Sequence, residues 1–516
     1  MSNTEEPTKS RRSGGRNARK AMRELPVTAD KRIIRPGMEG GLFKPLKGAD
    51  VGRIHSAALD VLATIGLSDP IPSCVELVTK AGGKLSDEGR LLFPKALVED
   101  TIAKAGRNFP LYARNPDQDM EPWGKKVHFG TAGAAVHIYD SEEHVYRESN
   151  LQDLYDISRL VDYLDNIHFL QRPLVARDVI DPEALDINTA YACLAGTSKH
   201  VGTSWSNATN LQQSLEMLHM IAGGEDKWRE RPFVSQSCCF VVPPLKFAED
   251  ASECLEAGVR GGMPILLLAA GQAGATSPAS LVGAVVQEVA EVLAGLVYVN
   301  AIVPGHPAIF GTWPFVSDLR TGAMSGGSGE QALLSAACAQ MANFYDLCGG
   351  IPAGMTDAKT PDAQHGYEKS YTETLLAHAG ANLVYESAGM QGSLLGFSKE
   401  ALVIDNDMIG GIQRTVRGLD INDDSLSIET IRSVCIDGPG HYLGHEQTLH
   451  RMEREYHYPI IGDRKSPKEW IESGSEKIMA SARRMVKDVL SRDRINHIPL
   501  EIDAEIRAKF DILLEN

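Results

Sequence analysis

The chain has 516 residues, of which 43% are hydrophobic and 23% are charged, a composition typical of a soluble enzyme. Its formal net charge of −16 argues against nucleic acid or an anionic membrane as the main partner, because both bind basic surfaces. No run looks apolar and long enough to span a bilayer. The eight cysteines have no CxxC spacing, so we expect a cytoplasmic protein whose thiols are reduced and buried in the core. The vicinal pair Cys238–Cys239 is the one pair that could have a role other than packing.

The first 150 residues predict two segments that lie outside the main domain. Residues 1–36 are polar and basic, with no apolar run after them, and predict a disordered tail rather than a secretory signal. Residues 37–150 predict a small N-terminal region. Helical spacing of apolar residues comes first in this region, and short alternating segments that read as antiparallel strands follow.

From residue 151 to about 458, predicted helices and short buried strands alternate. Seven helix–strand units are clear, and an eighth strand is expected around residues 433–440, after a helical stretch that contains 403–416. We therefore predict an α/β fold: a (β/α)8 TIM barrel with an N-terminal helical and β extension, followed by C-terminal helices over residues 459–516. A doubly wound sheet is the alternative, although the chain has neither GxGxxG after a first strand nor GxxxxGK[ST].

The stretch from residue 306 to 369 carries the clearest signal of a site. Its apolar runs Pro307–Phe310 and Ile351–Gly354 have the length of buried parallel strands, and each leads directly into polar residues. An α/β barrel builds its active site from side chains just past the carboxyl ends of its strands. We therefore expect the site at this end of the barrel.

Aromatic and charged side chains at the predicted strand ends suggest a pocket for a cation. Aromatic faces attract quaternary ammonium groups, and Trp205, Trp313 and Phe310 could supply them. The alternative is that the two tryptophans cap the barrel core. Asp357 and Glu386 are the candidate catalytic carboxylates, since they could set the charge beside such a cation.

Two further sets of residues have more than one interpretation. Arg320 could hold a carboxylate, or it could belong to a structural ion pair. The motif GPGHYLGHEQTLH places His441 and His445 four residues apart, with His450 beyond, a spacing that can bind zinc on one helix face. It lacks the glutamate of HExxH and any completing acid or cysteine, so we favour a structural or substrate-side role and predict no metal site. Gln171–Arg172 also follows a predicted strand and receives no role.

Five ordered segments resemble the trimethylamine:corrinoid methyltransferase family, over about residues 42–458. They are GHPAIFGTWPFVSDLRTGAMSGGSGEQALLSAACAQ, GMTDAKTPDAQHGYEKSY, GANLVYESAGMQGSLL, VIDNDMIGGIQRTVRG and GPGHYLGHEQTL. The resemblance implies a TIM barrel that moves a methyl group from an amine to Co(I) of a separate corrinoid protein, which docks on the barrel mouth.

One departure from the family bears on the substrate. The founding trimethylamine enzymes carry pyrrolysine in the barrel, whereas this chain contains only standard residues. Relatives without pyrrolysine are implied to demethylate glycine betaine or similar quaternary amines. A quaternary ammonium needs no covalent activation, because attack by Co(I) releases a neutral tertiary amine. Such an enzyme works by positioning the N-methyl group, and it should not overstabilise a positive charge that is lost during the reaction.

The leading hypothesis is a corrinoid-dependent methyltransferase for a quaternary amine, with glycine betaine as the expected substrate and cobalamin carried by a partner protein. Arg320, Gln236 or Gln272 would bind the substrate carboxylate. The alternatives are the same chemistry on proline betaine, carnitine, γ-butyrobetaine or trimethylamine, a non-catalytic barrel that binds betaine, and a zinc enzyme that uses His441 and His445. A homo-oligomer is expected.

Overall fold

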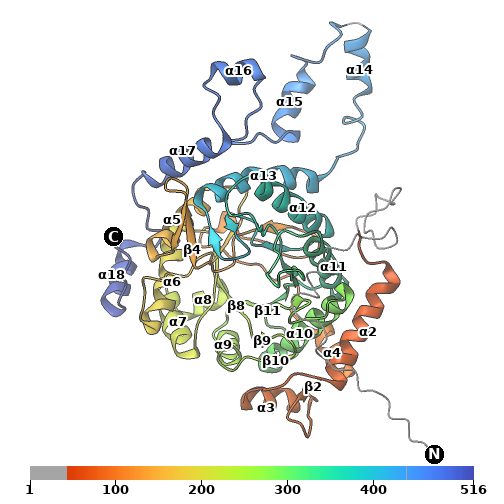
Figure 1. Ribbon diagram of the computed structural model, residues 1–516, viewed down its shortest axis with the longest axis vertical. Coiled ribbons are helices and arrows are strands. Elements are labelled where there is room, and N and C mark those ends of the chain that lie inside the picture. Colours follow the sequence, from red (N-terminus) through yellow and green to blue (C-terminus); the bar gives the residue numbers. More distant parts are fainter. Residues whose placement is uncertain (1–43, 437, 516) are drawn as a thin grey trace, which may run out of the picture. The chain divides into compact units, whose positions relative to one another are not determined.

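Eight parallel strands pair into a closed ring in the computed structural model, which describes residues 44–436 and 438–515. Helices surround these central strands in Figure 1. Around the ring the strands are β3 (His128–Phe129), β6 (Phe169–Gln171), β7 (His200–Thr203), β8 (Val234–Cys238), β11 (Ile265–Ala269), β13 (Ala308–Thr312), β15 (Gly350–Pro352) and β16 (Leu383–Tyr385). Parallel ladders join most neighbours, and single bridges from Gly130 to Phe169 and from Phe310 to Gly349 complete the ring. The predicted (β/α)8 barrel is therefore confirmed. The predicted tail at 1–36 lies outside the described residues.

Each barrel strand leads into a helix that packs outside the ring. In the order of their strands the helices are α5 (Leu151–Tyr163), α6 (Pro182–Gly196), α7 (Ala208–Ala222), α9 (Glu249–Arg260), α10 (Leu281–Ile302), α11 (Gly329–Tyr345), α12 (Ala363–Ala379) and α13 (Lys399–Arg417), with the short α8 (Glu225–Glu230) after α7. Side chains cap many of their first turns. Asn150, for example, accepts from the backbone N–H of Asp153, whose carboxylate accepts from Asn150 in return.

The prediction of the eighth strand was wrong. Residues around 433–440 contain the end of helix α14 (Ile428–Cys435) and turns, and the strand that closes the ring is β3. The sequence placed β3 in the N-terminal region outside the barrel. At two residues it is too short to show a buried-strand pattern, and the neighbouring β4 (His137–Asp140) and β5 (Val145–Glu148) do form an antiparallel hairpin. Pairing with β16 on one side and a bridge to β6 on the other make it a barrel strand.

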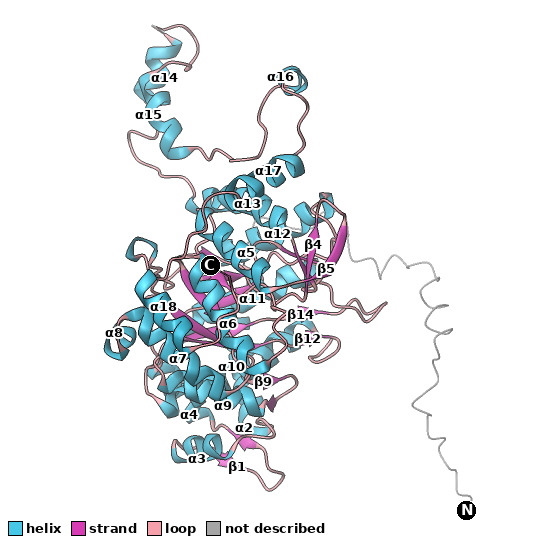
Figure 2. Ribbon diagram, turned by 90° about the vertical axis from the view of Figure 1, so that its left-hand side faces the viewer, coloured by secondary structure: helices cyan, strands magenta, loops and turns pink. Residues whose placement is uncertain are grey.

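Helix α10 is the most apolar helix of the barrel. Its length and hydropathy would allow it to cross a membrane, contrary to the expectation from the sequence, but most of it is buried within the structure. The N-terminal helices α2 (Gly48–Thr64), α3 (Pro72–Lys80) and α4 (Lys95–Lys104) pack on α10, which also packs on β11 and β13, and they lie toward the lower end of the molecule in Figure 2. Because α10 is covered by strands and by helices, it carries apolar residues on all its faces, as a core helix does, rather than being amphipathic.

Short strands and terminal helices complete the described part of the chain. The short strands are β1 (Lys84–Leu85), β2 (Leu91–Leu92), β9 (Val241–Val242), β10 (Lys246–Phe247), β12 (Gln272–Ala273), β14 (Phe315–Val316), β17 (Met390–Gln391) and β18 (Gly396–Phe397). After α14 come α15 (Glu446–Glu455), α16 (Pro467–Glu472), α17 (Ile478–Leu490) and α18 (Leu500–Lys509). Helix α17 packs on α13 and α5, and α18 packs on α7.

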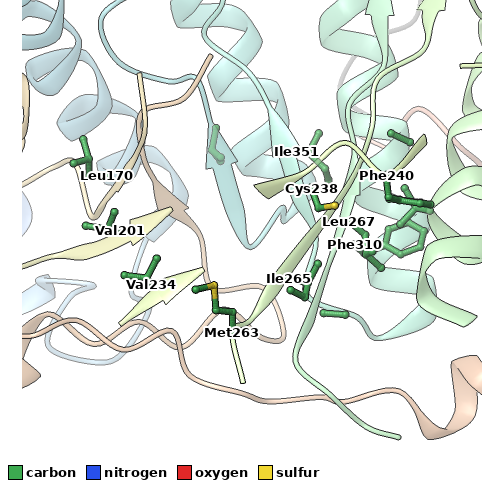
Figure 3. Packing of buried hydrophobic residues seen from close by; sticks show 14 of the residues in the cluster. Leu170, Val201, Val234, Cys238, Phe240, Met263, Ile265, Leu267, Phe310 and Ile351 are labelled. Atoms are coloured by element: carbon green, nitrogen blue, oxygen red, sulfur yellow. The ribbon is translucent and has the colours of Figure 1, made fainter. Parts of the chain in front are cut away.

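Alternate residues of the barrel strands face opposite sides, which gives two separate cores. The outer core lies between strands and helices and includes Val234, Leu267 and Phe310 (Figure 3). The inner core fills the barrel and includes Phe169, Leu266, Leu268, Ile309, Leu383 and Tyr385. The barrel is therefore packed below its mouth, and a ligand can enter only from the strand ends.

Candidate functional site

A cavity of about 360 Å³ opens at the carboxyl ends of the barrel strands. Its wall is built mostly from residues at or just past the ends of every barrel strand except β15, with contributions from α9 and from Leu394 between β17 and β18. This is the end at which α/β barrels carry their active sites. Four of the residues predicted from the sequence line the cavity: Trp205, Gln236, Trp313 and Glu386.

The indole ring of Trp313 is fixed in the cavity wall. Its Nε1 donates to the carbonyl oxygen of Gly350 at 3.1 Å, and its ring centroid lies 5.4 Å from that of Tyr385 and 6.4 Å from that of Phe315. Its backbone N–H donates to Glu288 Oε2 at 3.1 Å, and Glu288 Oε1 accepts from Gly271 N. A buried carboxyl group of helix α10 thus holds the backbone just after two neighbouring strands.

Trp205 lies on the loop that follows β7, and this loop is anchored by Asp186 of α6. Asp186 Oδ2 accepts from the backbone N–H of Ser206 at 2.8 Å, from its hydroxyl at 2.7 Å and from Asn210 Nδ2 at 3.1 Å. Among the described residues, the buried indole N–H of Trp205 has no hydrogen-bond partner. Backbone contacts and packing therefore set the two tryptophans just past the ends of β7 and β13.

Glu386 is a fully buried carboxyl group in the wall of the cavity. Neither carboxyl oxygen has a hydrogen-bond partner among the described residues. Burial raises the pKa of Glu386 to about 8, while the positive charge of Lys369 lowers it, so the carboxyl is mostly protonated at neutral pH. Its φ of 63° lies in the left-handed region, which is uncommon outside glycine and is a type of strain that gathers at functional sites.

A buried ionic network lies on α12 and α13 behind this part of the wall. Asp405 accepts from the backbone N–H of Gly389 at 2.7 Å, and its two oxygens lie 2.8 Å from His365 Nε2 and 3.2 Å from Lys369 Nζ. Lys369 also donates to the carbonyl oxygen of Gly354. The network therefore ties the loops after β15 and β16 to the helices that follow them, and it supplies the cation whose field reaches Glu386.

Two predicted site residues are structural. Phe310 lies on the outer face of β13, where its ring packs 5.5 Å from Tyr345, because the strand alternation directs Ile309 into the barrel instead. Asp357 lies outside the cavity and joins three loops: it accepts from Gly326 N at 2.7 Å, Ser325 Oγ at 3.0 Å and Ser393 Oγ at 2.5 Å. The cation-pocket prediction for Phe310 is wrong, and the geometry of Asp357 is that of a loop anchor.

The structure also places Arg320 and Gln272 outside the cavity. Arg320 is largely exposed and forms a two-pronged pair with Asp318, with Nη2 to Oδ2 at 2.8 Å and Nε to Oδ1 at 3.0 Å. Gln272 belongs to the short strand β12, which pairs with β14 beyond the ring. Both residues lie farther along their loops than the first residues after a strand, so the barrel does not direct their side chains into its mouth.

Two neighbouring residues without an assigned role line the cavity, Gln171 and Arg172. Their position at the end of β6 is the feature of the sequence that could have identified them as cavity residues. The vicinal cysteines also line it, together with Cys254. All eight cysteines are free, and burial raises the pKa of the Cys239 thiol, so it is protonated at neutral pH.

The histidine motif lies far along the chain from the cavity residues. His445 is the N-cap of α15, where its Nδ1 accepts from Gln447 N at 3.1 Å. Among residues 44–436 and 438–515, no group of three or more His, Cys, Asp or Glu side chains is arranged to hold a metal ion. The observed role of His445 is structural.

Comparison with known proteins places the chain in a family. The model of the family described as trimethylamine methyltransferase (MTTB) matches residues 12–511. This chain belongs to that family. The trimethylamine methyltransferase MttB of Desulfitobacterium hafniense (strain DSM 10664 / DCB-2) is 31% identical over 88% of this chain and 91% of its own length. That of Methanosarcina thermophila is 31% identical over 92% and 97%.

Two further similarities were found. The glycine betaine methyltransferase of D. hafniense (strain Y51) is 29% identical over 90% of this chain and 95% of its own length. The crystal structure of the Methanosarcina barkeri monomethylamine methyltransferase (MtmB) aligns with a TM-score of 0.45 and 13% identity, over 87% of this chain and 93% of that one. As a member of the trimethylamine methyltransferase family, the chain is a methyltransferase enzyme.

Proposed function

We propose that this methyltransferase moves a methyl group from a quaternary amine, with glycine betaine as the expected donor, to Co(I) of a separate corrinoid protein in the cytoplasm. The observation that carries the proposal is the cavity at the barrel mouth, which sets Trp205 and Trp313 beside a buried carboxyl group. At about 360 Å³ it lies near the lower end of the range of ~300–1,000 Å³ for ligand pockets, as a small donor requires.

The electrostatics of the wall suit a donor that loses its charge. A quaternary ammonium is cationic in the ground state and leaves as a neutral amine, so an ionised carboxylate beside it would stabilise the ground state more than the transition state. The attraction of an aromatic face for such a cation is weaker, and it contributes only about 0.5–2 kcal/mol. Glu386 keeps its proton at neutral pH and adds no full negative charge. Positioning of the N-methyl group toward the open mouth supplies the remaining catalysis.

The curated relatives do not decide between donors, because relatives named for trimethylamine and for glycine betaine have similar identities to this chain. The choice of a quaternary amine rests on two observations: the chain contains only standard residues and so has no pyrrolysine, and the cavity wall combines aromatic side chains with a protonated carboxyl group. Proline betaine, carnitine and trimethylamine are the competing donors. A barrel that binds betaine without turnover is the competing function.

The test is a spectral assay that follows loss of the Co(I) corrinoid absorbance with each donor. We expect glycine betaine to consume Co(I) and trimethylamine not to. Trp313→Phe should lower the apparent affinity for the donor about 5- to 30-fold, since it removes part of a cation–π contact, whereas Trp470→Phe on α16 serves as a matched control without effect. Turnover with trimethylamine alone would contradict the proposal. Binding of betaine without turnover would favour the binding protein.

A further inference from the structure

Arg172 is the one cationic side chain among the described residues that line the cavity. It directly follows β6, and its backbone N–H donates to the carbonyl oxygen of Gly202 at 2.8 Å, which continues the β6–β7 pairing to the rim. The residue is only partly buried. Its position is therefore set by the barrel, while its side chain borders the space that a ligand would fill.

The guanidinium of Arg172 differs from other arginines near the site in its pairing. Within residues 44–436 and 438–515 its side chain has no hydrogen bond or ion pair. Arg177, five residues further on, pairs with Glu148 at 2.7 Å, and Arg320 pairs with Asp318 at 2.8 Å. A guanidinium in a cavity without a partner has lost part of its hydration, and an anionic ligand would compensate for that loss.

The titratable groups around Arg172 do not neutralise it. Glu386 is the one carboxyl group in the cavity wall and is mostly protonated at neutral pH. Burial raises the pKa of the Cys239 thiol, so this neighbour is neutral as well. Burial lowers the pKa of the Arg172 guanidinium, and Asp186 of α6 acts in the opposite direction, but Asp186 is engaged with the loop after β7. A guanidinium keeps its proton throughout the working pH range, so the cavity carries a positive charge at this point.

We infer that Arg172 binds the carboxylate of the methyl donor and thereby selects zwitterionic quaternary amines over quaternary amines that lack an anionic group. The planar fork of a guanidinium matches both oxygens of a carboxylate. A donor such as choline brings a second positive charge into the same cavity and nothing to pair with Arg172. The inference rests on the proposed function and names the class of donor and the residue that selects it.

The experiment measures binding to the full chain in the absence of corrinoid, by titration calorimetry with glycine betaine and with choline. The wild type should bind glycine betaine at least tenfold more tightly than choline. Arg172→Gln should weaken betaine binding about 10- to 100-fold and leave choline binding equal or tighter, as loss of a charge-assisted contact predicts. Arg177→Gln and Arg320→Gln are the matched controls and should bind as the wild type does.

Three outcomes overturn the inference: equal binding of choline and betaine by the wild type, unchanged betaine binding by Arg172→Gln, or loss of binding in Arg320→Gln instead. If Arg172→Gln does not fold by circular dichroism, Arg172→Lys carries the test. It keeps the charge without the fork, and it should retain the preference for betaine with a smaller loss of affinity. Co(I) turnover is measured separately. Preference for betaine without turnover contradicts only the proposed function, and turnover that is insensitive to Arg172 contradicts only the inference.

Discussion

The buried carboxyl group of Glu386 predicts a specific dependence of stability on pH. Its pKa is about 8 in the folded chain against an ordinary value of 4.5. Below pH 4.5 the group is protonated in both states and contributes no pH dependence. Between pH 4.5 and 8 the unfolded chain releases the proton and the folded chain keeps it, so stability falls as the pH rises. Above pH 8 both states are ionised and the loss is complete, at roughly 4–5 kcal/mol.

The substitution that tests this reasoning is Glu386→Gln, which keeps the shape of the side chain and cannot ionise. The free energy of unfolding of this variant, relative to the wild type, should rise by roughly 4 kcal/mol between pH 5 and pH 9. Guanidinium denaturation at pH 5, 7 and 9 provides the measurement. The exposed acid Glu453 supplies the control, since Glu453→Gln should show no such rise.

A constant difference between Glu386→Gln and the wild type across this range would refute the reasoning. It would mean that the carboxyl group is already ionised in the folded protein. The cavity would then contain a full negative charge that balances Arg172, and both the electrostatic argument for the donor and the inference about its carboxylate would lose their basis.

Two further predictions concern the residues behind the cavity. Lys369→Met leaves the buried Asp405 without its cation and should lower the free energy of unfolding by about 3–5 kcal/mol, whereas Lys104→Met, which breaks an exposed pair with Asp100, should change it by less than about 1 kcal/mol in the same denaturation assay. Asp357→Asn should cost about 1–3 kcal/mol, because three loops lose a charged acceptor, while betaine affinity in calorimetry stays near that of the wild type. Loss of turnover in Asp357→Asn with intact stability would return this residue to a catalytic role.

The sequence by itself determined the repeated helix–strand architecture and the end of the barrel at which the site lies. Periodicity is a local property, and residues immediately after a strand are directed to the barrel mouth whatever the rest of the chain does. This is why Trp205, Trp313 and Glu386 line the cavity, as their places after the strands predicted. It is also why Arg320, several residues into its loop, was placed wrongly, since the path of a long loop depends on contacts such as the one with Asp318.

Only the tertiary structure decided how the ring closes and how the site is charged. The strand β3 has two residues, and it is identified as part of the barrel by its neighbours β16 and β6 rather than by its own pattern. Burial raises the pKa of Glu386, and the Arg172 side chain has no hydrogen bond or ion pair among the described residues. The burial and the pairing of a side chain depend on neighbours that are distant in the chain. The charge states of Glu386 and Arg172 in the cavity are therefore set only when the barrel is closed.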